Sequence, residues 1–388
     1  MELSRVTKTF TESVIREMTR VARQHPGTIN LAQGFPDFGA PEKLKQAAVD
    51  AINADINQYA ITWGSKNLRN AIADKVRSYN RMNWVKADKN ITVTCGATEA
   101  MMSSLKAIIN PGDEVVIFEP FYENYGPDCR LSDSTPRYVT LDPPEWDFDA
   151  EKLKEAFNNN TKAIIINTPN NPTGKIFGMD EMQLIRDLCI DYDAIAVTDE
   201  IYEHILYEEH EHISIASLDG MSDCSITVNS ASKTYSVTGW RVGWAIASSK
   251  ITQEIKKVHD FLTVGAPAPL QEAVAFALRM QNSYYDWLAE FYTEARNTLY
   301  YALEESPLEP IKPYGAYYII CNAEKYMKRE GLENSMDLAM QLIEEIGVAT
   351  VPGSSFYREP GYGEYQTRFC FSKKLETLEA AARKLKKL

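Results

Sequence analysis

SITVNSASKTYSVTGWRVGWAIA (residues 225–247) contains two apolar runs, SITVN and VGWAIA, joined by a segment rich in serine, glycine and charge. Short runs of Val, Ile and Ala between turn residues are typical of strands that are buried on both faces of a sheet. Lys233 follows the first run, although a lysine is almost never fully buried without a partner. It is therefore either a surface residue at a strand end or a group with a chemical role.

Similar apolar runs recur upstream, at ITVTC (91–95), EVVIF (114–118), KAIIIN (162–167) and AIAVTD (194–199). Helical patterns lie between several of them, at 99–109, 150–157 and 179–192. Buried strands that alternate with helices indicate a mostly parallel sheet covered on both faces. The sequence therefore predicts an α/β fold with three layers, a sheet between two layers of helices.

The chain changes character from about residue 285. Long amphipathic helical patterns and short strand patterns follow, which predicts a smaller α+β domain (helices 284–305, 335–346 and 375–387; strands around 315–321 and 366–371). An N-terminal helix, about 8–24, is expected to pack with it. The predicted division is an N-terminal arm (1–44), a large domain (45–284) and a small domain (285–388).

Composition limits the classes of function. The formal net charge of −13 over 388 residues disfavours non-specific nucleic-acid binding, which needs a basic surface. No apolar stretch reaches membrane-spanning length, and the N-terminal segment lacks a signal-peptide core. The six cysteines are scattered without a CxxC motif, which is typical of reduced cytoplasmic thiols. Three of the five histidines, His204, His210 and His212, fall in an acidic stretch that we interpret as a solvated loop and not a metal site.

Polar residues stand where the predicted strands end, and ligands of open parallel sheets bind outside those ends. Strand 91–95 leads into Gly96, Ala97 and Thr98, which open a helix. The free N–H groups of a helix start attract phosphate, although glycine is also common in ordinary turns at this position.

Two further strands end in polar side chains. Strand 162–167 runs into NTPNNPTG, a rigid corner that either serves structure alone or holds the Asn171 amide over the sheet edge. Asp199 closes strand 194–199, where a carboxylate is costly unless it has a partner; the alternative is a cap for the next turn.

The polar residues at the strand ends also include Lys233, Ser230, Ser232 and Arg241. The two hydroxyls and the guanidinium suit an oxyanion such as phosphate. Together these residues match a ligand with a phosphate, a phenolic oxygen, a basic ring nitrogen and an aldehyde. Pyridoxal 5′-phosphate carries those four groups, and its enzymes use a lysine and an Asp partner for the ring nitrogen.

Several motifs extend the match over essentially the whole chain: NQYAITWGSKNLRNAI, TCGATEA, NTPNNPTGK, TDEIY, SASKTYSVTGWRVGW, GAYY and RFCFS. In this order they resemble the class I/II aminotransferases, fold type I of the pyridoxal-phosphate enzymes. INLAQGFPDF and FEPFYENY are most similar to the kynurenine–glutamine and methionine aminotransferase branch.

The resemblance implies a role for each position near the cofactor. Lys233 would bind it covalently and then act as general base, and Asp199 would keep its ring nitrogen protonated. Asn171 and Tyr202 would donate hydrogen bonds to its ring oxygen. Tyr122 would stack on the ring, and the phosphate would be held by Gly96, Ala97, Thr98, Ser230 and Arg241.

The resemblance also implies a substrate site and a partner. Arg368, with the Gly34 backbone and Asn171, would bind the α-carboxylate of the substrate, although the residues alone favour an ordinary strand-end arginine at 368. Tyr59 would reach a phosphate across the interface of a homodimer with composite sites.

The expected activity is transfer of an amino group from an amino acid to a 2-oxo acid, with a neutral, aromatic or sulfur amino acid as donor. A β-lyase and an aminocyclopropane-carboxylate synthase would use the same residues. An aspartate enzyme is a further alternative, disfavoured because one aspartate branch carries a lysine at the position of Thr98. A cofactor-sensing transcription regulator would need a basic DNA-binding domain, which does not fit this acidic chain.

Overall fold

A seven-stranded sheet forms the centre of the computed structural model, which describes residues 2–208 and 210–388; Met1 and Glu209, which fall in the predicted domain ranges, lie outside it. In spatial order its strands are β2 (Ile91–Thr94), β8 (Gly243–Ala247), β7 (Ser225–Ser230), β6 (Ile195–Asp199), β5 (Thr161–Asn167), β3 (Glu114–Glu119) and β4 (Thr135–Thr140). Only β8 pairs antiparallel with its neighbours, so the prediction of a mostly parallel sheet is confirmed. The sequence analysis did not find β4, an edge strand that contains a proline.

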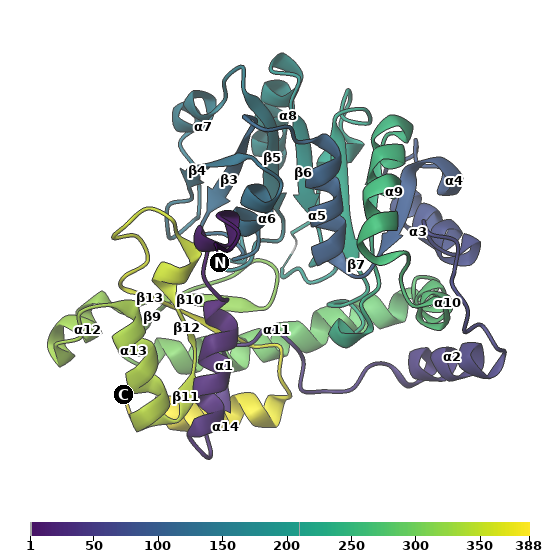
Figure 1. Cartoon of the computed structure of the whole chain (residues 1–388). Coiled ribbons are helices and arrows are strands. Elements are labelled where there is room, and N and C mark those ends of the chain that lie inside the picture. The colour runs from purple at the N-terminus through teal and green to yellow at the C-terminus, as the bar shows by residue number, and fades with distance from the viewer. Residues whose placement is uncertain (1, 209) are drawn as a thin grey trace.

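Side chains of the central strands alternate between two cores. Ala163 and Ile165 of β5 pack against one layer of helices, and Ile164 and Ile166 pack against the other. The first layer contains α5 (Ala97–Ile108), α6 (Tyr125–Leu131) and α9 (Ser249–Thr263). The second contains α7 (Ala150–Ala156) and α8 (Met179–Asp191), so that the sheet lies between helices as predicted (Figure 1).

A third core covers the β2–β8 edge of the sheet, where Val93 and Trp244 are buried. The surrounding helices are α2 (Glu42–Asn53), α3 (Lys66–Ser78), α4 (Ala87–Asn90) and α10 (Ala268–Ala277). Three short 3₁₀ turns follow later in the chain, η2 (Ile215–Ser217), η3 (Thr238–Trp240) and η5 (Gly353–Phe356).

The C-terminal part has its own four-stranded antiparallel sheet and its own core. Its strands are, in spatial order, β12 (Val351–Pro352), β13 (Gln366–Cys370), β10 (Tyr318–Asn322) and β9 (Glu309–Ile311). Its helices are α11 (Asn282–Glu304), α12 (Glu324–Glu330), α13 (Ser335–Gln341), the π-helical turn η4 (Leu342–Ile346) and α14 (Leu375–Leu385).

The N-terminal helix is shorter than predicted. A 3₁₀ turn η1 (Val6–Lys8) comes first, and α1 spans Val14–Gln24 instead of starting near residue 8. The reason is Ser13, an N-cap in extended conformation whose hydroxyl accepts a hydrogen bond from the backbone N–H of Arg16.

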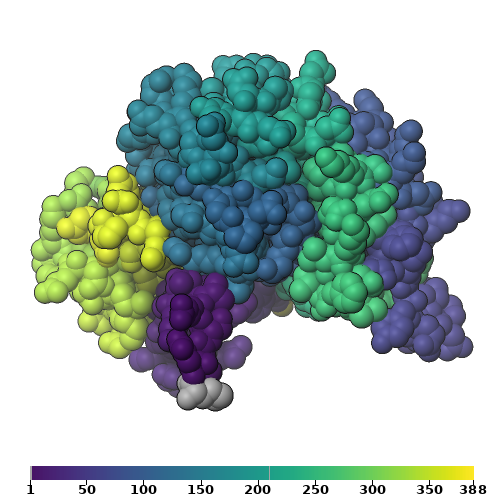
Figure 2. Space-filling view, turned by 45° about the horizontal axis from the view of Figure 1, so that its top comes forward, coloured from purple at the N-terminus to yellow at the C-terminus, as the bar shows by residue number. Residues whose placement is uncertain are grey.

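α1 lies against the small domain (Figures 1 and 2). Met18 and Ala22 of α1 share a buried cluster with Ala339 and Ile343. The strand that follows, β1 (Ile29–Asn30), pairs in parallel with β11 (Val348–Ala349). The division at 44/45 and 284/285 stays a proposal, and the second boundary falls in the first turn of α11.

No helix within 2–208 and 210–388 has the length and apolar character needed to cross a membrane.

Candidate active site

A cavity of about 440 Å³ opens at the carboxyl ends of the central parallel strands. Asp199 is the last residue of β6, Asn167 is the last of β5, and Lys233 follows β7. Eleven residues singled out from the sequence line it: Gly34, Ala97, Thr98, Tyr122, Asn171, Asp199, Tyr202, Ser232, Lys233, Arg241 and Arg368. The fold thus brings together residues that are up to 334 positions apart, from Gly34 in the N-terminal segment to Arg368 of β13.

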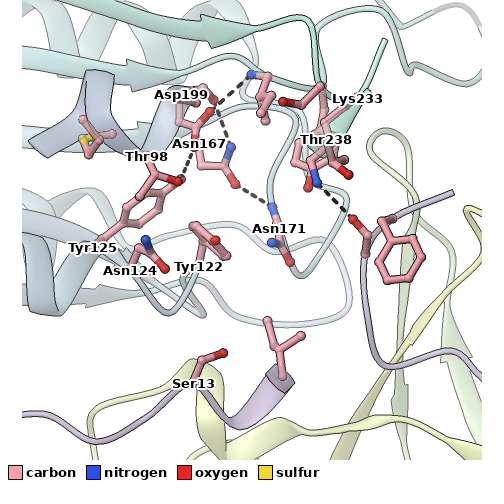
Figure 3. Close-up of a pocket in the computed structure, with 18 of the residues that line it drawn as sticks. Ser13, Thr98, Tyr122, Asn124, Tyr125, Asn167, Asn171, Asp199, Lys233 and Thr238 are labelled. Atoms are coloured by element: carbon pink, nitrogen blue, oxygen red, sulfur yellow. Dashed lines mark hydrogen bonds between the residues drawn. The ribbon is translucent and has the colours of Figure 1, made fainter. Parts of the chain in front are cut away.

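Asp199 is a buried carboxyl with few partners. Tyr125 Oη donates to its Oδ2 at 2.8 Å, and the backbone N–H of Ile201 donates to its Oδ1 at 3.3 Å. Burial raises the pKa of Asp199 to about 6, against the opposing effect of the Tyr125 hydrogen bond. Such a group favours a nearby positive charge, and Figure 3 shows Asp199 and Lys233 on the same side of the cavity.

Lys233 brings an amine to the same cavity. Its Nζ donates to the backbone oxygen of Gly34 at 3.0 Å, and the rings of Tyr202 and Tyr317 lie 5.9 and 5.7 Å from it. Burial lowers the pKa of Lys233 to about 8. A substantial fraction of this amine is therefore neutral near pH 8, as a nucleophile or a general base must be.

A chain of amides joins Asp199 to the far wall of the cavity. Asn167 Nδ2 donates to the backbone oxygen of Asp199 at 2.9 Å, and Asn167 Oδ1 accepts from the backbone N–H of Asn171 at 2.6 Å. Asn171 Oδ1 in turn accepts from Arg368 at 2.8 Å. Because that oxygen is engaged, the Asn171 Nδ2 donors are left for a ligand.

Arg368 is fully buried, between the rings of Tyr318 and Phe356 at 4.2 and 4.9 Å. Its second terminal nitrogen donates to the backbone oxygen of Ala32 at 2.6 Å. Its Nε has no hydrogen-bond partner among the residues that the structure describes. A buried guanidinium without a counter-charge is costly, so this arrangement suits an incoming carboxylate.

The start of α5 forms a concave site with Arg241. A Cβ on Gly243 would lie 2.5 Å from the carbonyl carbon of Gly96 and 2.6 Å from the nitrogen of Ala97, and one on Gly96 would lie 2.4 Å from Arg241. Only glycines allow these backbones and the guanidinium to come so close. Arg241 Nη1 and Nη2 donate to Thr238 O and Cys95 O. The free N–H groups of the helix start and this cation together suit an anion.

Gly34 and Tyr202 lie where the cavity meets Tyr318 of β10. A Cβ on Gly34 would lie 2.0 Å from Tyr318 Oη, so the backbone oxygen that Lys233 binds can lie here only on a glycine. Tyr202 Oη and Tyr318 Oη are 3.0 Å apart. Tyr122 meets the ring of Tyr125 edge to face at 5.7 Å.

Three predicted residues lie outside the cavity wall. Gly96 stands directly behind Arg241, and Ser230 Oγ accepts from the Ser232 backbone N–H at 3.1 Å. Tyr59 is 86% exposed and lines a separate shallow pocket of its own segment. Their assigned roles stay predictions.

Asn167, Tyr125 and Tyr318 were not predicted from the sequence as site residues. Asn167 could have been found by the same strand-end rule that selected Asp199. Tyr125 and Tyr318 carry no comparable local signal, since their hydroxyls act across 74 and 116 positions of sequence.

The histidine stretch is less solvated than predicted. His212 Nε2 lies 2.9 Å from buried Glu200, and His204 packs between Tyr79 and Tyr285. Only His210 is exposed among the three.

One group of side chains in this region has the geometry of a metal site. It consists of Glu200, Glu203 and His212, whose ligand atoms lie within 4.8 Å of one another. Hydrogen bonds from Ser214 and Asn229 already engage the two carboxylates. The prediction of no metal stays a prediction.

Comparison with known proteins gives one consistent result. The family model described as aminotransferase class I and II matches residues 26–385. Methionine aminotransferase of Escherichia coli K12 is 35% identical over 377 residues, covering 97% of this chain and 96% of that protein. Human kynurenine–oxoglutarate transaminase 1 is 33% identical, covering 96% and 94%.

The chain belongs to the class I and II aminotransferases. A crystal structure of YbdL from Escherichia coli, with an identified methionine aminotransferase function, superimposes with a TM-score of 0.94 at 33% identity and full coverage of both chains. The protein is thus a pyridoxal-phosphate-dependent transaminase with the fold of that family.

The residues of this aminotransferase fit its cofactor. The α5 start with Arg241 suits a phosphate, the amine of Lys233 suits an aldehyde, and the buried carboxyl of Asp199 suits a protonated ring nitrogen. The free Asn171 amide suits a ring oxygen.

Covalent attachment of pyridoxal phosphate to the cofactor-free aminotransferase is expected to depend on pH through Lys233. Its amine is neutral only above its pKa, so the rate should rise about tenfold per pH unit below pH 8 and level off above it. Borohydride trapping at a series of pH values, with peptide mapping, measures this rate. If the midpoint of the rate against pH lay near the ordinary lysine pKa of 10.5, the pKa of the Lys233 amine would not be lowered.

Proposed function

We propose that this aminotransferase transfers the amino group of a neutral, aromatic or sulfur-containing amino acid to 2-oxoglutarate or a similar 2-oxo acid, by a ping-pong mechanism. The meeting of the Lys233 amine, the Asp199 carboxyl and the Arg368 guanidinium in one cavity carries the proposal. The aromatic rings of Tyr122, Tyr125 and Tyr318 in the wall suit a large uncharged side chain. The two curated relatives named above are named for methionine and kynurenine.

The proposed roles follow from the chemistry of each group. Pyridoxal phosphate supplies an electron-withdrawing ring that accepts the electron pair of the substrate Cα–H bond. Lys233 Nζ removes the proton from that Cα, and its lowered pKa places the neutral amine in the working range. Asp199 holds the proton on the ring nitrogen.

The surrounding residues bind and orient the substrate and the cofactor. Arg368 binds the α-carboxylate, since its guanidinium lines the cavity. Asn171 Nδ2 and Tyr202 Oη hold the ring oxygen, and Tyr122 covers a ring face. Gly96, Ala97, Thr98, Ser230 and Arg241 hold the phosphate.

Half-reactions test the mechanism. We expect an amino donor alone to convert the cofactor to its amine form, seen as an absorbance change, before any 2-oxo acid is added. A panel of donors against 2-oxoglutarate should show turnover with at least one neutral or aromatic amino acid. A panel in which only aspartate and glutamate react would favour the aspartate enzyme instead.

A C–S β-lyase is the second candidate, because the same Lys233 and Asp199 serve both reactions. Release of pyruvate and ammonia from a β-substituted amino acid, with no 2-oxo acid present, would favour the lyase.

We also propose a homodimer with composite sites. Tyr59 and Phe261 are 86% and 93% exposed, and Thr62 Oγ1 donates to Asp260 Oδ1 at 3.1 Å, which joins their two segments. Ile61, Leu262 and Val264 add to this apolar surface. Large exposed aromatic side chains in one place are typical of an interaction surface.

Mixed dimers are expected to separate the two halves of a composite site. A Tyr59→Ala chain and a Lys233→Ala chain would damage a site from opposite sides, so a heterodimer would contain one intact site. It should recover up to about half of wild-type activity if the sites are independent. The comparison requires that Tyr59→Ala alone is clearly impaired. Heterodimers as poor as both parents, or an active wild-type monomer, would show that Tyr59 serves its own subunit.

We propose the cytoplasm as the compartment, since the free cysteines suit a reducing environment. Recovery of the protein in a secreted fraction after cell fractionation would contradict it.

A further inference from the structure

Arg16 is a cation in the cavity wall that none of the proposed roles uses. It belongs to α1 and lines the same cavity as Lys233 and Arg368. Its side chain is exposed, and it takes part in no ion pair within residues 2–208 and 210–388. An arginine held at the edge of a ligand cavity without a counter-charge is available to an anionic ligand.

The start of α1 is held in place by a half-buried carboxylate. Glu123 accepts from Ser13 Oγ at 2.5 Å and from the backbone N–H of Ile15 at 3.1 Å. Ser13 also caps the helix through the backbone N–H of Arg16. These bonds tie the first turn of α1 to the loop that follows β3, so Arg16 stays beside the cavity.

This turn lies at the substrate side of the cavity. Figure 3 shows Ser13 at the opposite side from Asp199 and Lys233, with Tyr122 and Asn171 between them. A group that projects from this turn faces the part of the cavity beyond the residues assigned to the cofactor. The side chain of a substrate held by Arg368 and Asn171 extends into this part.

No carboxylate among the described residues forms an ion pair with Arg16, although its charge, after that of Arg20, contributes to lowering the pKa of Glu12. Glu12 is engaged by both terminal nitrogens of Arg20, and Glu123 is engaged by Ser13 and Ile15. Glu17 is its exposed neighbour in sequence. Of the acidic residues in the wall, Asp199 has its own partner in Tyr125, and Asp128 is buried, with its pKa raised to about 7. The positive charge of Arg16 thus remains available.

We propose that Arg16 binds the distal carboxylate of a dicarboxylic 2-oxo acid, while Arg368 binds its α-carboxylate. The inference rests on the proposed function. It names the residue that contacts the acceptor 2-oxo acid and does not contact a neutral amino donor. A guanidinium can bind a carboxylate through two parallel hydrogen bonds, which selects a dicarboxylate over a neutral acid. Because Arg16 is exposed, a neutral donor leaves it hydrated at little cost, so one cavity can serve both substrate classes.

Binding of two matched acids to the holoenzyme tests the contact without turnover. Glutarate and pentanoate both have five carbons and differ only in the distal carboxylate. We expect Arg16→Gln to weaken glutarate about tenfold and to change pentanoate by less than about twofold, measured by absorbance titration. Arg23→Gln, in the last turn of the same helix, exposed and outside the cavity wall, is the matched control and should behave as wild type.

Half-reactions supply the second readout. With the amine form of the enzyme, Arg16→Gln should lower the rate constant over Kd for 2-oxoglutarate about tenfold and leave that for 4-methylthio-2-oxobutanoate unchanged. Arg16→Lys should recover part of the loss. Equal losses for both acids, no loss for either, or a wild type that does not accept 2-oxoglutarate would overturn the inference. Absence of transamination with every neutral amino acid would instead contradict the proposed function.

Discussion

Lys233→Ala is expected to lower the rate of transamination by about 10⁴-fold. The variant loses the amine that attaches the cofactor and the base that moves the Cα proton. In the structure this amine donates to Gly34 O and has a pKa lowered to about 8, which suits it to both roles. Rates with a saturating amino donor and 2-oxo acid measure the loss.

Borohydride reduction of the wild-type protein supplies the direct check. The holoenzyme is expected to be yellow, and reduction should fix the cofactor to a peptide that contains Lys233. Lys373 is the informative competitor, because its Nζ is also buried, donating to Phe35 O at 2.6 Å beside the same loop. A label on Lys373 would refute the assignment. Lys328→Ala, an exposed residue paired with Glu324, should retain full activity.

Asp199→Ala is expected to leave the cofactor attached to Lys233 while nearly abolishing transamination. Without the carboxylate the ring nitrogen loses its proton, and the ring no longer accepts negative charge. If its pKa falls by about three units, the cost is about 4 kcal/mol, which corresponds to a loss on the order of a thousandfold. Stopped-flow absorbance of the donor half-reaction measures this rate.

Tyr125→Phe is the matched control for Asp199. It keeps the carboxylate and removes only the 2.8 Å hydrogen bond to Oδ2, so the expected loss is about tenfold. Near-normal turnover in Asp199→Ala, or equal losses in the two variants, would contradict the role of Asp199. Borohydride mapping of Asp199→Ala should still find Lys233, which separates loss of chemistry from loss of cofactor.

Most of the large domain could be predicted from the sequence because its signals are local. The runs that form β2, β3, β5, β6, β7 and β8 are continuous and apolar, as strands buried on both faces must be. The start of α1 was not predicted correctly, because the first turn is decided by Ser13 and by Glu123, which is 110 positions away.

The site was predictable where a residue's type and strand position carry the information. Asp199 and Lys233 are charged groups next to buried strands, and that conflict alone marks them. Arg368 was different: nothing near it in sequence separates it from an ordinary strand-end arginine. Its burial between Tyr318 and Phe356 and its bond to Asn171 distinguish it.

The sequence by itself determined the alternation of strands and helices, the strand ends that carry polar groups, and hence the cofactor. These follow from short-range patterning, since the side-chain period and the free N–H groups of a helix start are local properties. The tertiary structure alone decided that Tyr125 bonds Asp199, that Arg368 is buried in the cavity wall, and that Arg16 lines the same cavity. Such contacts join positions far apart in the chain, and they exist only once the two domains and the N-terminal helix have packed.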